Sequence, residues 1–151
     1  MKNKYEISNN TCALVAKSED NILIIEKEGE IELSTKMQKF INYNCEYYGS
    51  SFLGRLKGSK SLLGMKYKLP IIIEESREII FFPTKAYNSE SCDWISLNNI
   101  VDYENHNLKT LVTFNNNQKY LFDISIDSFE NQVLRATKLL LILKNRKKEI
   151  K

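Results

Sequence analysis

The chain has 151 residues, of which 42% are hydrophobic and 11% aromatic, the composition of a globular protein and not of a disordered one. This length favours a single domain, residues 1–151, with room for a sizeable core. No apolar run approaches the ~18 residues of a transmembrane helix, and the charged start MKNKYEISNN lacks the apolar stretch of a signal peptide, so we expect a cytoplasmic protein without a membrane partner.

The net charge of +3 hides two basic blocks on an acidic body. Residues 47–73 hold five basic side chains and no acid, and residues 135–151 hold seven basic side chains and one acid, which leaves a net charge of −8 on the rest of the chain. This distribution favours an anionic partner, although a solvated basic surface is the plain alternative, above all for the tail. The last residues, 144–151, form a candidate disordered basic tail.

The first third of the chain has the pattern of a β-hairpin. Thr11–Lys17 and Asn21–Lys27 predict two strands around the turn sequence SEDN. Gly29 then bends the chain before Glu30–Leu33, where apolar residues alternate with acids.

From residue 36 the hydrophobic period changes to that of a helix. Apolar residues recur every three or four positions at Met37, Phe40, Ile41, Cys45 and Tyr48. We expect Ser34 or Thr35 to cap the start of this helix and Gly49 to end it.

The next segment combines glycine with positive charge. Four of the five glycines and five basic residues lie in YYGSSFLGRLKGSKSLLGMKYK, residues 47–68. Glycine allows a backbone to approach a ligand closely, and lysine and arginine neutralise phosphates. We therefore expect a flexible loop that lies against a polyanion, and we expect residues 54–68 to bury little and to contribute to binding and not to folding. The DNA-binding candidates are Gly54, Arg55, Lys57, Gly58, Lys60, Lys66 and Lys68.

Four aromatic residues accompany these glycines, and they either anchor the segment to the core or stack on bases: Tyr47, Tyr48, Phe52 and Tyr67. The segment is not a P-loop, because Arg55 occupies the lysine position and Leu56 occupies the magnesium-binding position. Composition alone leaves an acidic protein, a lipid surface or a plain surface loop open as alternatives to nucleic acid.

Five β-rich runs follow, at Lys68–Ile73, Glu78–Thr84, Trp94–Tyr103, Thr110–Phe114 and Lys119–Ser125. Pro70 indicates an edge strand or a strand start, because proline cannot donate to a strand ladder. Asp127 and Glu130 resemble a capping box that opens a helix from Ser128 to about Lys147. About seven short strands with one helix after the first hairpin and one at the C-terminus predict a mostly antiparallel α+β domain, in an order like that of pleckstrin-homology domains.

The residues that carry chemistry are few. The cysteines are odd in number and widely spaced, which predicts reduced, buried thiols at Cys12, Cys45 and Cys92. The single histidine, His106, lies in a polar turn, and no Cys or His pair has metal-ligand spacing. An enzyme would have to use His106 and the thiols alone, so we expect no catalytic residue, metal or cofactor.

Residues 45–96 resemble the bacterial competence transcription factor family, ComK. The matching elements occur in the family's order: Cys45-Glu46-Tyr47-Tyr48-Gly49, Gly54-Arg55, Lys68-Leu69-Pro70-Ile71, Phe81-Phe82-Pro83-Thr84 and Trp94-Ile95-Ser96. The later stretch FNNNQKYLFDISIDSFENQ also follows the family's pattern, and the resemblance covers most of residues 5–137.

The resemblance implies a cytoplasmic, nucleoid-associated activator of genes for DNA uptake. Members of this family bind AT-rich duplex DNA as paired dimers, chiefly through the minor groove, and act with RNA polymerase under the control of a Clp-protease adaptor. This chain departs from the family near Asn98-Asn99, where members often carry histidine, and its basic end is short. A paralogue that modulates another factor is therefore an alternative to an activator.

Several motif residues have a structural interpretation. We expect Phe81, Phe82 and Trp94 in the core, Pro83 at a strand end and Gly49 at a helix end. Among the motif residues, Arg55 with its neighbours Lys57 and Lys60 is the leading functional candidate, and we expect Arg55 to enter a narrow A-tract groove. The rival hypothesis is a non-enzymatic interaction module whose basic loop binds anionic headgroups or an acidic protein.

Overall fold

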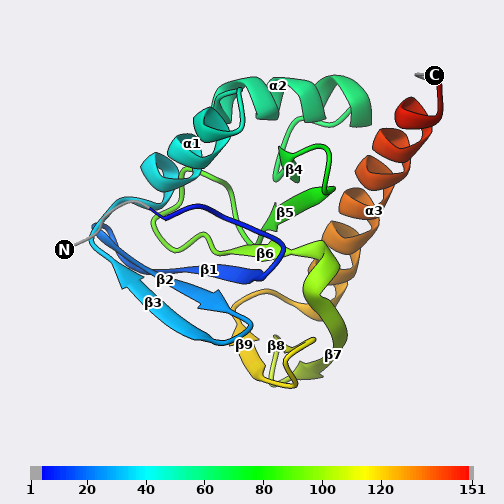
Figure 1. Cartoon of the computed structure of the whole chain (residues 1–151). Coiled ribbons are helices and arrows are strands. Elements are labelled where there is room, and N and C mark those ends of the chain that lie inside the picture. Colours follow the sequence, from blue (N-terminus) through cyan, green and yellow to red (C-terminus); the bar gives the residue numbers. More distant parts are fainter. Residues whose placement is uncertain (1–4, 150–151) are drawn as a thin grey trace.

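The computed structural model describes residues 5–149. Within them the chain forms a six-stranded sheet, a three-stranded sheet and three α-helices, and all strand pairs are antiparallel (Figure 1). The elements are β1 (Thr11–Ser18), β2 (Asn21–Glu26), β3 (Gly29–Leu33), α1 (Met37–Tyr47), α2 (Phe52–Leu63), β4 (Ile71–Glu74), β5 (Ile79–Pro83), β6 (Trp94–Ser96), the 3₁₀ turn η1 (Leu97–Asn99), β7 (Ile100–His106), β8 (Lys109–Phe114), β9 (Lys119–Phe122) and α3 (Ile126–Glu149). The expected α+β class is confirmed, with nine strands in the described residues where about seven were expected.

The large sheet has the order β3-β2-β1-β6-β5-β4, and the small sheet has the order β7-β8-β9. The run from Trp94 to Tyr103 was expected as one strand, but η1 divides it between the two sheets. The buried Asn99 lies at this break, and its side-chain amide donates to the backbone oxygens of Asn9 and Thr11 at 3.1 and 2.9 Å. A polar residue so fully bonded fixes the corner between the sheets.

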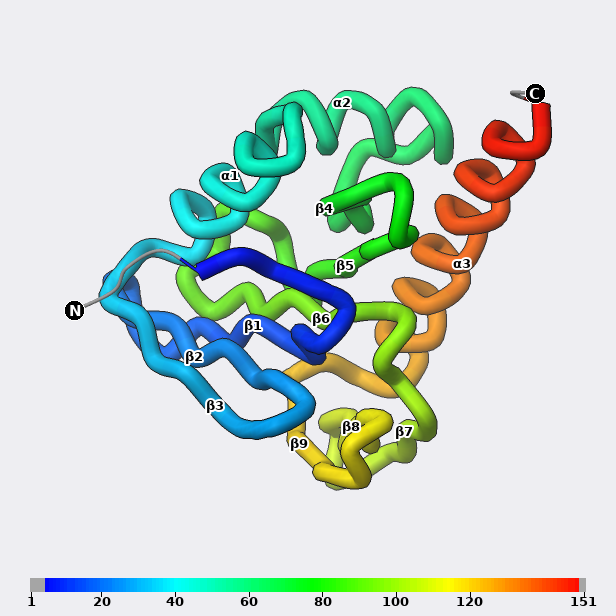
Figure 2. The backbone as a smooth tube through the Cα atoms, in the orientation of Figure 1, coloured from blue at the N-terminus to red at the C-terminus, as the bar shows by residue number. Residues whose placement is uncertain are grey.

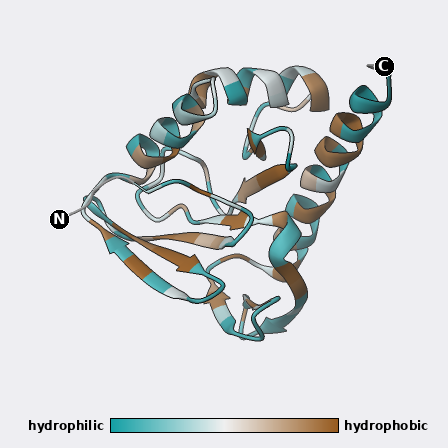
Figure 3. Ribbon diagram, in the orientation of Figure 1, coloured by the Kyte–Doolittle hydropathy of each residue, from teal (hydrophilic) through white to brown (hydrophobic). Residues whose placement is uncertain are grey.

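Both faces of the large sheet are buried, and successive side chains along a strand pack alternately into the two cores. Along β5, Phe81 packs against the core beneath α1, whereas Phe82 packs against the core beneath α3, where its ring meets Phe129 at 5.6 Å. Trp94 and Ile95 divide between the same two cores. Because neighbouring residues of a strand point to opposite faces, a continuous apolar run covers both cores, and β5 is hydrophobic along its length in Figure 3.

The first helix has the expected range but not the expected cap. Neither Ser34 nor Thr35 caps α1, because the N-cap position falls on Lys36, which makes no side-chain capping bond. Gly49 ends the helix as expected, with φ +92° and its N–H bonded to Glu46. The positive φ explains why glycine is needed at this position.

The second helix corrects a central expectation. Residues 52–63 were expected to form a flexible loop and instead form α2, which starts from Ser51 and ends at Gly64. The hydroxyl of Ser51 accepts the N–H of Gly54 at 3.0 Å, and Gly64 adopts the left-handed conformation at φ +67°. From α2 the chain turns back to β4, the edge strand (Figure 2).

Burial of one α2 face overrides the low helix propensity of its glycines. Phe52 packs into the core beneath α1, and Leu63 packs into the core beneath α3. The small Ser59 between them is also buried. The helix therefore joins the two cores across the β4 edge, and within residues 54–68, which were expected to bury little, Ser59 and Leu63 are the buried residues.

The C-terminal helix also begins differently from the expectation. Ser125 caps it, since its hydroxyl accepts the N–H of Ser128 at 3.2 Å, and the capping box of Asp127 and Glu130 is not formed. Residues 144–149 of the expected disordered tail are helical, and residues 150–151 lie outside the described residues.

Candidate nucleic-acid interface

All four predicted DNA-binding lysines line one groove beside α2, with a volume of about 500 Å³. We call it the lysine groove. Its lining consists of Lys57, Lys60, Lys66 and Lys68 with the apolar residues Leu53, Leu56, Leu69 and Tyr87 and the small residues Ser51 and Gly54.

The helical period explains why two of the four lysines, Lys57 and Lys60, lie close together. Leu53, Lys57 and Lys60 are separated by four and three residues, so they occupy one face of α2. Lys66 and Lys68 come from the segment that follows Gly64 and line the same groove. The groove thus lies between a helix and the segment that returns from it.

The four lysines carry free positive charge. Within residues 5–149 none of them forms an ion pair or a side-chain hydrogen bond, and no acidic residue lines the groove. Six other cations in the described part of the chain do pair with carboxylates: Lys36, Arg55, Arg77, Lys85, Lys144 and Lys147. Charge left unpaired in one place is the electrostatic footprint of an anion-binding surface.

The returning segment is attached to α3. Gln132 donates to the carbonyl oxygen of Lys68 at 3.0 Å and to that of Pro83 at 2.8 Å, and Arg135 donates to the carbonyl oxygen of Tyr67 at 3.1 Å. Lys68 itself has φ +51°, a conformation that non-glycine residues seldom adopt. These bonds hold the backbone of Lys68 in place. The strand β4 begins only at Ile71, so Lys68 lies before it, contrary to the expected strand boundary.

The two predicted glycines differ in their surroundings. A Cβ on Gly54 would lie 3.0 Å from the capping hydroxyl of Ser51, so this glycine makes room for the helix cap. A Cβ on Gly58 would meet nothing within 4 Å, and its φ is not positive. Gly58 is exposed on α2 without a structural need for glycine.

Arg55 is separated from the other predicted binding residues. Two residues along a helix correspond to a rotation of about 200°, so Arg55 lies nearly opposite Lys57. Its side chain is 16% exposed and forms an ion pair with Glu75 at 3.4 Å. Its Nε is buried and has no hydrogen-bond partner among the described residues. Of the three leading candidates, Lys57 and Lys60 line the lysine groove, whereas Arg55 attaches α2 to the β4–β5 turn.

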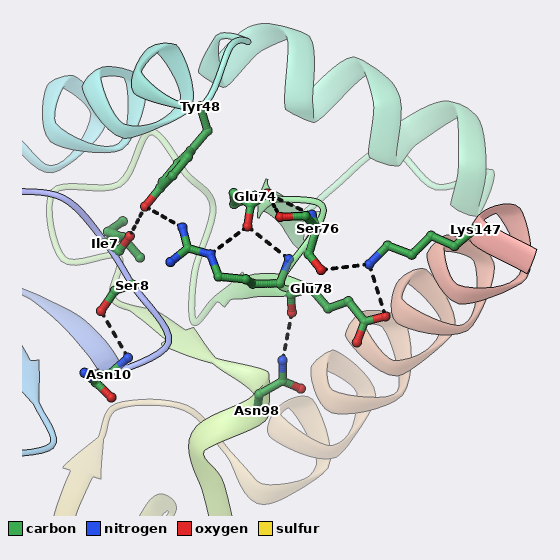
Figure 4. A network of polar contacts seen from close by, with 10 residues as sticks. Ile7, Ser8, Asn10, Tyr48, Glu74, Ser76, Glu78, Asn98 and Lys147 are labelled. Carbon is green, nitrogen blue, oxygen red and sulfur yellow. Dashed lines mark hydrogen bonds and ion pairs between the residues drawn. The ribbon is translucent and has the colours of Figure 1, made fainter. Parts of the chain in front are cut away.

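A polar network organises that turn (Figure 4). Arg77 bonds Glu74 at 2.9 Å and the hydroxyl of Tyr48 at 3.1 Å, and Tyr48 donates to the carbonyl oxygen of Ile7. Burial alone would raise the pKa of Glu74, but hydrogen bonds from Ser76 and Arg77 outweigh it and lower the pKa to about 2.

The same turn holds the end of α3. Glu78 pairs with Lys144 at 3.2 Å and with Lys147 at 3.4 Å, and Lys147 also donates to the carbonyl oxygen of Ser76. Burial opposes ionisation of Glu78, yet the two lysines lower its pKa. The basic end of α3 is thereby partly neutralised, in contrast to the lysine groove.

The structural motif residues lie as expected. Phe81, Phe82 and Trp94 are buried, Pro83 is the last residue of β5, and Pro70 directly precedes the edge strand β4. Of the aromatic residues in 47–68, Phe52 is buried, whereas Tyr67 is 80% exposed.

All three cysteines are buried and free. Burial raises the pKa of each thiol, at Cys12, Cys45 and Cys92, to about 11. His106 is exposed at the end of β7. In residues 5–149 no three His, Cys, Asp or Glu side chains are grouped closely enough to hold a metal ion.

The sequence analysis did not assign to the site five residues that line the groove, Ser51, Leu53, Leu56, Leu69 and Tyr87, or the supporting Gln132. Tyr87 lies in the β5–β6 connection, where its ring meets Phe52 at 5.4 Å, and no sequence signal links it to α2. Gln132 sits on the buried face of α3 and is predictable only once its carbonyl partners are known. Leu53 had a detectable signal, since it shares a helical face with Lys57 and Lys60.

Comparisons with known proteins agree with the sequence pattern. The chain matches the family model described as "ComK protein" over residues 2–148. It is 32% identical over 136 residues to the "Competence transcription factor" of Bacillus subtilis (strain 168), an alignment that covers 87% of this chain and 71% of that protein. No solved structure matches the chain. None of the helices in the described residues has the length and hydrophobicity needed to cross a bilayer.

Proposed function

Because the chain belongs to the ComK family, we propose that it is a transcription regulator of competence genes that binds AT-rich duplex DNA with the lysine groove. The observation that carries the proposal is the convergence of four unpaired lysines around one groove without an acidic residue. Each phosphate that a lysine neutralises releases counterions, so the binding free energy comes largely from the DNA backbone.

The composition of the groove supports recognition by DNA shape. Lysine contacts to phosphates position a protein without distinguishing sequences, and the groove lining contains no Asn, Gln or Arg for base edges. A preference for AT-rich DNA then comes from the narrow minor groove of A-tracts and its strong negative potential.

The C-terminal helix is a poorer candidate for a major-groove reading helix. Its residues Leu139 and Leu143 are buried in the core, and Glu78 holds two of its terminal lysines. A helix inserted into the major groove presents free polar side chains to base edges, and this face of α3 is already covered.

The family membership also supports the wider assignment. We infer that the protein acts in the cytoplasm at the nucleoid, as a homodimer or pair of dimers, with RNA polymerase and a Clp-protease adaptor as partners. Activation and modulation of a second factor are both compatible with the DNA-binding surface, and transcription from a target promoter with and without the protein distinguishes them.

The deciding experiment exchanges A·T pairs for I·C pairs in a bound duplex, which alters the major-groove pattern and leaves the minor-groove acceptors much the same. We expect binding to survive the exchange and a small minor-groove ligand to displace the protein. Loss of binding on the exchange, with no effect of the ligand, would contradict the minor-groove mode. A parallel titration with anionic vesicles at the same salt concentration tests the rival headgroup function, and tighter binding to vesicles than to duplex would favour it.

A further inference from the structure

The floor of the lysine groove is apolar, which a phosphate backbone does not require. Leu53 is 66% exposed, Tyr87 is 41% exposed, and Leu56 and Leu69 complete the floor. Exposed large apolar side chains grouped inside a charged rim are typical of protein interaction sites. The groove therefore has one feature suited to an anion and a second suited to an apolar side chain.

The stretch of α2 that lines the groove is long enough to contact a short helical segment. Leu53 to Lys60 spans two turns of α2, about 10 Å along its axis. The segment after α2 contributes Lys66 and Lys68 to the same lining, so that an occupant of the groove meets lysines from both segments. Helices that bind in grooves insert apolar residues at positions i, i+3 or i+4, and i+7, and set polar residues against the rim.

We propose that the lysine groove also binds an acidic amphipathic segment of a partner protein, which competes with DNA. Charge complementarity selects this occupant: the rim has four unpaired lysines and no acid, so a segment needs carboxylates on its flanks as well as apolar residues toward Leu53 and Tyr87. The competition rests on the proposed DNA-binding function, whereas binding of the segment does not.

A fluorescent peptide tests the proposal with the full-length chain. The probe is a peptide of about 15 residues with leucine at i, i+4 and i+7 and glutamate on its flanks. The matched probe has serine in place of each leucine and the same charge. We expect the leucine probe to bind in fluorescence anisotropy and the serine probe to bind at least about tenfold more weakly, since it loses the apolar contacts. Equal binding of the two probes would overturn the proposal.

Two variants locate the site. Leu53→Ser should weaken the leucine probe about tenfold, whereas Leu134→Ser, a 67% exposed leucine on α3, should leave it unchanged. Wild-type binding by Leu53→Ser would also overturn the proposal, and thermal melting verifies that both variants remain folded.

The competition is measured separately. The leucine probe should displace a labelled AT-rich duplex at a concentration where the serine probe does not. Simultaneous binding of duplex and leucine probe would refute the competition. A protein that binds the leucine probe but no duplex would instead contradict the proposed DNA-binding function and leave the peptide site supported.

Discussion

The side-chain amide of Gln132 donates a hydrogen bond to the backbone carbonyl of Lys68 at 3.0 Å. A second bond from the same nitrogen reaches Pro83 at 2.8 Å. One buried amide on α3 thus connects the rim of the lysine groove to the end of β5. The strained φ of Lys68 persists at this point because the surrounding contacts hold its backbone in place.

Replacing Gln132 with Ala should therefore affect both folding and binding. The buried carbonyl of Pro83 and the partly buried carbonyl of Lys68 lose their donor, which we expect to lower the free energy of unfolding by about 1–3 kcal/mol in urea titrations. DNA affinity should also fall at temperatures where the variant is folded, because Lys68 is no longer held at the rim. The control is Asn131→Ala at the exposed neighbouring position. Unchanged stability of Gln132→Ala would show that these bonds contribute nothing to the fold.

Gly58 and Gly64 should respond oppositely to alanine. Gly58→Ala adds a methyl group in open space on a helix, so thermal melting should show stabilisation of up to about 1 kcal/mol. Gly64→Ala should destabilise by about 1 kcal/mol, because alanine is strained at φ +67°. Destabilisation by Gly58→Ala would contradict the helical assignment of this segment. Weaker DNA binding by a stabilised Gly58→Ala would indicate close approach of DNA at this position.

Mutation of the α2 lysines and mutation of Arg55 should have different effects on DNA binding. The double change Lys57→Ser and Lys60→Ser should weaken duplex binding and lower the slope of log affinity against log salt by roughly 1.8, about 0.9 for each lost phosphate contact. Arg55→Met removes only a partly exposed ion pair, worth about 0–1 kcal/mol, and should leave the slope unchanged. If Arg55→Met keeps the fold but loses most of its DNA binding, Arg55 itself contacts DNA, and this would contradict the present assignment.

The free energy of unfolding should depend on pH through the ionisation of Glu74. Its pKa is about 2 in the folded chain against 4.5 as the ordinary value, so its carboxylate stabilises the fold fully above pH 4.5. This contribution is lost as the pH falls from 4.5 through 2. In urea titrations across this range the difference between wild type and Glu74→Gln should shrink toward low pH. The exposed Glu90→Gln is the control, and a difference that is constant with pH would refute the role of the network.

The thiols should be inert in the native protein. Alkylation requires the thiolate, and burial raises the pKa of Cys45 to about 11 while it also blocks access. We expect labelling with iodoacetamide to be slow in buffer and fast in denaturant for all three cysteines. Rapid native labelling of Cys45 would mean that the core beneath α1 opens.

Local patterns determined much of this fold. The Ile and Phe content of residues 78–84 predicted a strand, and the spacing of three and four residues predicted α1 and α3. These predictions succeeded because the burial periods of strands and helices are properties of the local backbone and persist in any tertiary context. The family pattern in residues 45–96 likewise belongs to the sequence, and the comparisons bear it out.

Tertiary structure alone decided the nature of the basic segment. Its glycines lower helix propensity, yet Phe52 and Leu63 bury in two different cores and outweigh that cost, so the segment is α2. In a helix, residues two positions apart lie on nearly opposite sides, so Arg55 faces Glu75 while Lys57 lines the groove. Charge composition does not reveal this difference between the two cations. Tyr87 joins the groove through packing between residues far apart in the sequence, because contacts of that kind exist only after both cores have assembled.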